Sequence, residues 1–191
     1  EYFDDEYLIA GWGKKVDITN GPAYFAPVSA LTLNYNTTSI VVAPGPEDGE
    51  PARVELETPV DLFTLESTVT TGLLGSRPWM TIERKVDWRS GEITFTLEGN
   101  IPMGEEPWRY YRAVGDPKPY FMEVFEQMLA AQGIEVEGRS RLGRAPSSTV
   151  SLVSWKSSSL QDLLGQMNKN SSNLIAEQVL KAMGDEVHGA P

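Results

Sequence analysis

Residues 169–184, KNSSNLIAEQVLKAMG, combine a polar turn with a segment of helical periodicity. The apolar residues of that segment recur at helical spacing: Ile175, Val179, Ala182 and Met183. This spacing predicts an amphipathic helix that ends at Gly184. Ser171 or Ser172 is its expected N-cap, because a serine hydroxyl accepts hydrogen bonds from the unpaired N–H groups of a first helical turn. The turn also holds the only Ser-x-Asn triplet of the chain, Ser171 to Asn173.

A second helix is predicted directly before this turn. Ser158 or Ser159 can cap it, and Gln161 or Asp162 in the third position completes a capping box. Its apolar residues share one face of the helix: Leu160, Leu163, Leu164 and Met167. That face is expected to be buried. Two packed helices would hold the turn between them at a rigid corner, which suits catalysis better than a mobile loop does.

Further upstream, residues 24–114 have the pattern of a mainly antiparallel β unit. The apolar run 24–33, the turn at 34–36 and the run 39–42 together predict a hairpin. Residues 44–51 are rich in Pro and Gly and predict a surface loop. Five further runs have strand character: 53–57, 65–70, 79–85, 92–98 and 108–114. In the fourth of these, apolar and polar residues alternate, as in strands with one buried face. Residues 1–23 show no period and are expected to form a loop or an ordered arm.

After Gly115 the apolar residues recur at helical spacing. Asp116 is the expected N-cap of a helix, and Gly133 followed by Ile134 is typical of a glycine C-terminus with its hydrophobic contact. The apolar stripe of this helix is expected to lie in the core: Phe121, Met122, Phe125, Met128 and Leu129. Two short strands are predicted at 136–142 and 149–155. Residues 143–148 between them have the composition of a domain boundary.

The overall composition excludes several classes of function. With 191 residues and 40% hydrophobic content, the chain can bury a core. A net charge of −11 argues against nucleic acids and anionic membrane surfaces as partners. Because the chain has no cysteine, it offers no thiol nucleophile and no cysteine metal site. The single histidine, His188, excludes a zinc site made of several imidazoles, and it is expected in an exposed loop. We expect no metal and no organic cofactor.

The sequence contains no run of about 18 apolar residues, so no membrane-spanning segment is expected. The chain starts at Glu1 without a methionine and stops within the turn-like sequence Gly189-Ala190-Pro191. Both ends look like cuts, and a piece of a longer protein is expected. Trp79, Trp88 and Trp108 could form an aromatic platform for a ligand, or they could be ordinary core and sheet residues.

Three stretches of the chain carry a family resemblance, and their order and spacing carry it as well. They are LLGQMNKNSSNLIAEQVLKAMG at 163–184, AYFAPVSALTLNYNTTSIVVAPG at 23–45 and RAVGDPKPYFMEVFEQMLAAQGIEVEG at 112–138. Together they resemble the penicillin-binding D-alanyl-D-alanine carboxypeptidases and endopeptidases of the large-insert, class C type. The resemblance implies an α+β fold. Residues 1–144 would be a β-rich insert with one long helix, and residues 145–191 would be part of the penicillin-binding, β-lactamase-like transpeptidase domain.

The chemistry of that family needs a Ser-x-x-Lys, a Ser-x-Asn and a Lys-Thr-Gly element. This sequence contains only the second of them. The resemblance implies that Ser171 relays a proton between the nucleophile with its lysine and the leaving D-alanine amine. It also implies that Asn173 directs its amide at the peptide backbone of the substrate and at the catalytic lysine. Ser172, where relatives often carry Asp or Asn, would be structural. The isolated chain is expected to be inactive.

The function implied by the resemblance is serine acyl transfer on the stem peptides of peptidoglycan, with release of the terminal D-alanine. The full-length protein would then also bind β-lactams covalently. The family works outside the cytoplasmic membrane, so a periplasmic or other extracytoplasmic location is expected. The alternative is a non-catalytic β-rich module that binds glycan or protein in the cell envelope through its tryptophan-rich strands.

Overall fold

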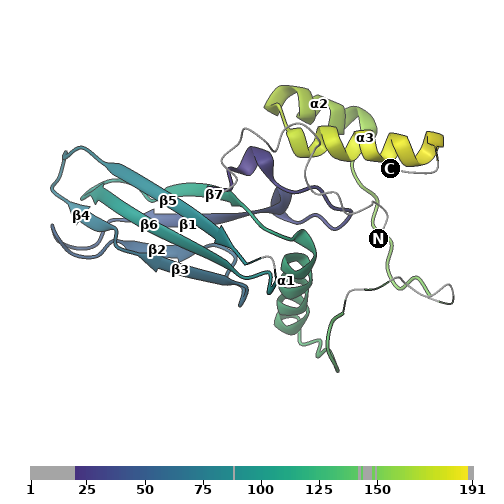
Figure 1. Ribbon diagram of the computed structural model, residues 1–191, viewed down its shortest axis with the longest axis horizontal. Coiled ribbons are helices and arrows are strands. Elements are labelled where there is room, and N and C mark those ends of the chain that lie inside the picture. The colour runs from purple at the N-terminus through teal and green to yellow at the C-terminus, as the bar shows by residue number, and fades with distance from the viewer. Residues whose placement is uncertain (1–19, 88, 142, 144–147, 149, 189–191) are drawn as a thin grey trace.

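The computed structural model describes residues 20–87, 89–141, 143, 148 and 150–188 (Figure 1). Most of the expected N-terminal arm, residues 1–23, and Trp88 therefore lie outside the described residues. The fold is α+β, as the sequence predicts. In Figure 1 the strands extend to the left, α1 lies at their right-hand end, and α2 and α3 lie side by side above it.

One sheet has three strands in the order β2-β1-β7, all antiparallel. Its strands are β1 (Thr37–Ala43), β2 (Arg53–Leu56) and β7 (Trp108–Ala113). The Pro-Gly-rich residues between β1 and β2 form a loop, as predicted. Because side chains alternate along β1, Ile40 and Val42 point into the core, while Ser39 and Val41 lie on the opposite face.

The second sheet has four strands built around β6 (Ile93–Pro102). β5 (Trp79–Val86) pairs with β6 in the antiparallel sense, while β3 (Phe63–Ser67) and β4 (Thr70–Gly72) pair with it in the parallel sense. The expected strand at 65–70 is thus two strands, and the expected antiparallel pairing is wrong for both. A period of two identifies a strand with one buried face, but it carries no information about the direction of the neighbouring strand.

Both sheets and α1 contribute to one hydrophobic core. α1 (Pro117–Ala131) places Tyr120 and Val124 in that core, and the ring of Tyr120 stacks on Phe63 with centroids 5.5 Å apart. The other buried members come from the strands and their ends: Ile40, Val42, Val60, Phe63, Val69, Ile82, Ile93, Phe95, Leu97, Ile101 and Val114.

The ends of α1 are those predicted from the sequence. The Asp116 side chain accepts a hydrogen bond from the backbone N–H of Lys118, and Gly133 adopts a φ of +75° after the last turn. The N–H of Ile134 donates to Leu129 O at 2.9 Å, which closes the helix. The predicted core stripe is wrong, because Phe125 and Met128 are exposed, and Phe121, Met122 and Leu129 are only partly buried and lie outside the core cluster. The helix reaches the core cluster through Tyr120 and Val124.

The predicted hairpin at 24–42 is wrong in its first half. Residues 26–33 form no strand, and β1 pairs with β2 and β7. This segment follows the short 3-10 helix η1 (Ala23–Phe25) and precedes η2 (Asn34–Asn36). Side chains bind its backbone in place of a neighbouring strand: Asn36 Nδ2 donates to Pro27 O at 2.8 Å, and Gln178 Nε2 donates to Ser29 O at 3.1 Å.

The two C-terminal helices are α2 (Leu160–Asn170) and α3 (Asn173–His188). Ser159 caps α2 and accepts a hydrogen bond from Asp162 N at 3.2 Å, which confirms the second of the two predicted caps. α3 continues past Gly184, so the predicted end of the helix and the predicted loop around His188 are wrong. A glycine inside a helix costs about 1 kcal/mol, which is not enough to end it.

The strands predicted at 136–142 and 149–155 do not form in the described residues 136–141 and 150–155, which are exposed coil. A single extended segment is not stable as a strand when no neighbouring strand forms hydrogen bonds with its backbone N–H and C=O groups. The domain boundary near residue 144 stays a prediction. Within the described ranges, none of the three α-helices combines the length and the apolar character needed to cross a bilayer.

Candidate functional site

The Ser-x-Asn turn is held by the helix ends on either side of it. Ser171 is the C-cap of α2 and has left-handed backbone angles, φ 50° and ψ 46°. Ser172 N donates to Met167 O at 3.0 Å, which ties the turn to the last turn of α2. Ser172 Oγ then accepts a long hydrogen bond, 3.4 Å, from Ile175 N in the first turn of α3. Ser172 is therefore the N-cap of α3, as one of the two predicted alternatives.

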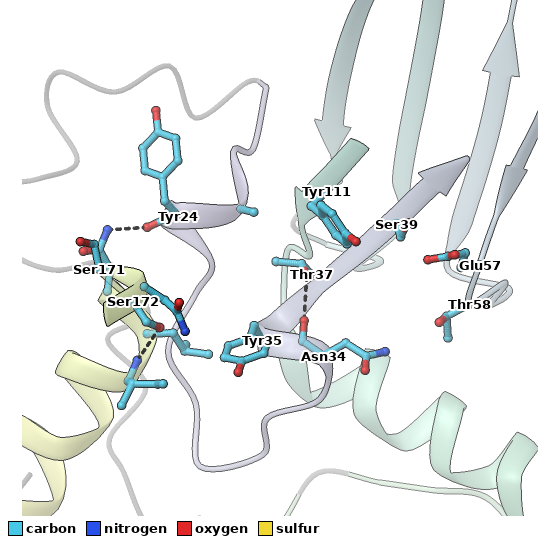
Figure 2. A pocket seen from close by; sticks show the side chains of 15 residues that line it. Tyr24, Asn34, Tyr35, Thr37, Ser39, Glu57, Thr58, Tyr111, Ser171 and Ser172 are labelled. Carbon is cyan, nitrogen blue, oxygen red and sulfur yellow. Dashed lines mark hydrogen bonds between the residues drawn. The ribbon is translucent and has the colours of Figure 1, made fainter. Parts of the chain in front are cut away.

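Contacts with the N-terminal part of the described chain fix the position of α3. Asn173 Nδ2 donates to Tyr24 O at 2.9 Å, a contact between residues 149 positions apart (Figure 2). Five residues further along the helix, Gln178 Nε2 donates to Thr32 Oγ1 at 2.6 Å as well as to Ser29 O. Two side chains of α3 thus bind segment 24–32, and the turn lies beside η1.

A cavity of about 710 Å³ opens between this turn and the three-stranded sheet. Residues from both ends of the described chain line it: Ala23, Tyr24, Asn34, Tyr35, Thr37, Ser39, Glu57, Thr58, Tyr111, Asn170, Ser171, Ser172, Asn173, Leu174 and Ile175. Figure 2 shows Ser171 and Ser172 beside Tyr24 on one side, and Ser39, Glu57, Thr58 and Tyr111 on the other. We call the latter four residues the sheet wall of the cavity.

The sheet wall contains one charged side chain, Glu57. Its Oε1 accepts a hydrogen bond from Arg109 Nε at 2.8 Å. That hydrogen bond is the main reason why the pKa of Glu57 lies below its ordinary value, and Ser39 lowers the pKa further. The carboxyl group is therefore ionised at neutral pH. The same contact raises the pKa of Arg109.

Both predicted site residues, Ser171 and Asn173, lie at the cavity. The sequence reasoning missed the residues across from them, Ser39, Glu57 and Tyr111, because nothing local in the sequence places two strands opposite a distant turn. Of the three tryptophans considered for an aromatic platform, the two that the structure describes do not line the cavity: Trp79 is exposed on β5 and Trp108 packs against the core. In the part of the chain that the structure describes, no group of His, Asp or Glu residues is arranged to hold a metal ion.

A family model describes the whole chain. Residues 1–191 match the D-Ala-D-Ala carboxypeptidase 3 (S13) family. The chain belongs to this family. It is also 31% identical to a D-alanyl-D-alanine carboxypeptidase from Actinomadura sp. (strain R39), over 99% of this chain and 35% of that protein. This S13 chain therefore spans about a third of the length of that relative.

Solved structures agree with the fold of the S13 chain. The structure of penicillin-binding protein 4 from Haemophilus influenzae superimposes with a TM-score of 0.74, over 100% of this chain and 40% of that chain, at 20% identity. A second structure of the same protein, in complex with a β-lactam, gives a TM-score of 0.67 over 92% of this chain and 39% of that chain, also at 20% identity. The family and the α+β fold predicted from the sequence are both confirmed.

Proposed function

We propose that this chain is part of a serine-type D-Ala-D-Ala carboxypeptidase or endopeptidase that acts on peptidoglycan stem peptides. The S13 family match over residues 1–191 carries the proposal. The geometry of the Ser-x-Asn turn supports it, because a hydroxyl and an amide sit between two helix ends at the edge of a cavity. The substrate lies in the cell wall, so the proposed location is the periplasm or another compartment outside the cytoplasmic membrane.

In the proposed reaction a serine attacks the carbonyl carbon of the scissile D-Ala-D-Ala bond, and the terminal D-alanine leaves as the free amine. Water then hydrolyses the acyl-enzyme. The nucleophile with its lysine, and the Lys-Thr-Gly element, would come from parts of the protein beyond this sequence, which contains neither motif. The same nucleophile would open the ring of a β-lactam.

Ser171 would carry the proton from the nucleophile side to the leaving amine. A serine hydroxyl can donate and accept at once, which this transfer requires. Asn173 would hold the peptide backbone of the substrate. Its Nδ2 already donates to Tyr24 O, so the orientation of the amide is set before a substrate binds. Pre-orientation of this kind lowers the entropy cost of reaching the reactive geometry.

The test uses the full-length protein and a β-lactam. We expect a covalent adduct by mass spectrometry, and we expect Ser171→Ala and Asn173→Ala to slow acylation by about 10²-fold or more. Asn168→Ala is the matched control, because Asn168 is an exposed residue of α2 that does not line the cavity. If the wild-type protein forms no adduct, the proposed activity is wrong. If both site variants react at the wild-type rate, the roles of Ser171 and Asn173 are wrong.

A further inference from the structure

The sheet wall of the cavity is organised as a row of three side chains across neighbouring strands. Ser39 on β1 pairs with Tyr111 on β7, and Glu57, which directly follows β2, donates its N–H to Ser39 O at 3.0 Å. Side chains at such opposed positions lie about 5 Å apart on the same face. All three line the cavity, with Ser39 in the middle (Figure 2).

Ser39 is the unusual member of this row. It is only 8% exposed, and its Oγ is buried with no partner at hydrogen-bond geometry among the described residues. Ser39 also helps to lower the pKa of Glu57, so its hydroxyl lies beside that carboxylate. A buried hydroxyl without a partner is unfavourable, and such groups in native proteins call for an explanation. A ligand hydroxyl or amide in the cavity would complete its hydrogen bonding.

Glu57 adds a strong acceptor beside this hydroxyl. Arg109 Nε binds one site on the carboxylate, which offers about four lone-pair positions in all. The remaining positions can accept hydrogen bonds from a ligand. Among the described residues that line the cavity, Glu57 is the charged one, and none is Lys or Arg. These described residues favour a neutral ligand that is rich in hydrogen-bond donors.

Much of the rest of the lining is aromatic or polar, and Ala23, Leu174 and Ile175 add aliphatic surface. Three tyrosines around the cavity are largely exposed: Tyr24 (62%), Tyr35 (55%) and Tyr111 (53%). A tyrosine ring offers an apolar face with a polar tip. Asn34, Thr37 and Thr58 add uncharged donors and acceptors. A pyranose ring has the complementary chemistry, because its C–H faces suit aromatic rings and its hydroxyls and acetamido groups suit carboxylate, amide and hydroxyl partners.

We propose that the sheet wall binds an N-acetylated sugar unit of the peptidoglycan glycan strand while the stem peptide lies at the Ser-x-Asn turn across the cavity. The choice of this glycan rests on the proposed function, whereas the site itself rests on Ser39, Glu57 and Tyr111. Since the sheet wall and the Ser-x-Asn turn face one cavity, the protein could bind the sugar and the stem peptide together as one ligand.

The experiment titrates the whole 191-residue chain with chitotetraose, a neutral β-1,4-linked oligomer of N-acetylglucosamine that lacks any peptide. We expect binding in NMR spectra, with shifts at Ser39, Glu57 and Tyr111. Glu57→Gln should weaken binding about tenfold, because it removes charge-assisted hydrogen bonds. Ser39→Ala should weaken it as well. Glu55→Gln is the matched control, since it removes the same charge from an exposed residue of β2 that does not line the cavity.

Three results would overturn the inference: no binding of chitotetraose, equal effects of Glu57→Gln and Glu55→Gln, or tighter, Glu57-dependent binding of a sugar-free stem peptide at the same wall. Failure of this inference can be distinguished from failure of the proposed function. If the sugar does not bind but β-lactam acylates the full-length protein, only this inference is wrong. If the sugar binds but no acylation occurs, only the proposed function is wrong.

Discussion

Ser171 combines a proposed chemical role with a strained backbone. Its φ of 50° lies in the left-handed region, which costs a residue with a Cβ about 1–2 kcal/mol. Glycine is the usual residue at a helix end with this conformation. The conformation lets α2 stop and α3 begin within two residues, which sets the direction of the Ser171 hydroxyl. Strain at this position is consistent with a residue kept for its side chain.

Two substitutions separate the role of the backbone from the role of the side chain at this turn. Ser171→Gly should raise the free energy of unfolding by up to about 1 kcal/mol, because glycine adopts the left-handed region without a steric penalty. Ser172→Ala should lower it by about 1 kcal/mol, because the N-cap hydroxyl of α3 is lost. Denaturant unfolding measures both. A destabilised Ser171→Gly variant would contradict the left-handed assignment.

Glu57 provides a prediction about pH. Because the Arg109 hydrogen bond lowers its pKa in the folded state, the ionised carboxylate stabilises the fold at neutral pH. This contribution is lost as the pH falls through the lowered pKa. Arg109→Gln should return the pKa of Glu57 toward its ordinary value, measured by pH titration of the carboxyl ¹³C shift. Arg53→Gln, which breaks the neighbouring pair with Glu55, should leave it unchanged. An unchanged pKa of Glu57 in the Arg109→Gln variant would show that a group other than Arg109 lowers it.

At the scale of elements, two glycines occupy different positions relative to a helix, one just past a helix end and one inside a helix. Gly133 ends α1 with a φ of +75°, while Gly165 lies inside α2. A Cβ at either position would meet open space, so only the backbone conformation distinguishes the two. The end of α1 depends on the left-handed residue, whereas the middle of α2 would be more stable with alanine.

Alanine at these two positions should therefore have opposite effects. Gly133→Ala should lower the free energy of unfolding by about 1 kcal/mol, because alanine is forced into a positive φ. Gly165→Ala should raise it by about 0.5–1 kcal/mol through the better helix propensity of alanine. Thermal unfolding followed by circular dichroism measures the difference. Equal effects of the same sign would mean that the assigned helix ends are wrong.

Across the whole molecule, burial is distributed unevenly. The core cluster draws on β1, β3, β5, β6 and α1, whereas α2 contains no buried residue and α3 buries Leu174 and Ile175 at its start. α2 and α3 are held mainly by each other and by the Asn173 and Gln178 hydrogen bonds to segment 24–32. The Ser-x-Asn turn thus sits on the less buried part of the molecule.

Hydrogen exchange should reveal this asymmetry. Amides in the middle of β6 should exchange only through global unfolding, whereas those of α2 should exchange through local opening with much lower protection, because few buried contacts hold α2 in place. Native-state exchange followed by NMR or mass spectrometry measures both in one sample. Equal protection of β6 and α2 would contradict the prediction and would show that the helices and sheets unfold as one unit.

The features that the sequence predicted correctly depend on near neighbours in the chain. The Asp116 cap, the Gly133 terminus and the Ser159 cap involve contacts within one or two helical turns, so their signals are local. The period of β6 identified a strand with one buried face for the same reason. The Ser-x-Asn turn between two helices was also predictable, because each helix carries its own amphipathic pattern.

The sequence by itself thus determined that three helices form, that β1, β2, β5, β6 and β7 are strands, and that Ser171 to Asn173 lie between two helices. Tertiary structure alone decided that β3 and β4 run parallel to β6, that segment 26–33 binds side chains of Asn36 and Gln178 in place of a strand, and that Glu57, Ser39 and Tyr111 face the turn across a cavity. The physical reason is the range of the interactions. A cap or a period is encoded by adjacent residues, whereas strand direction and a shared cavity depend on contacts between residues far apart in the chain.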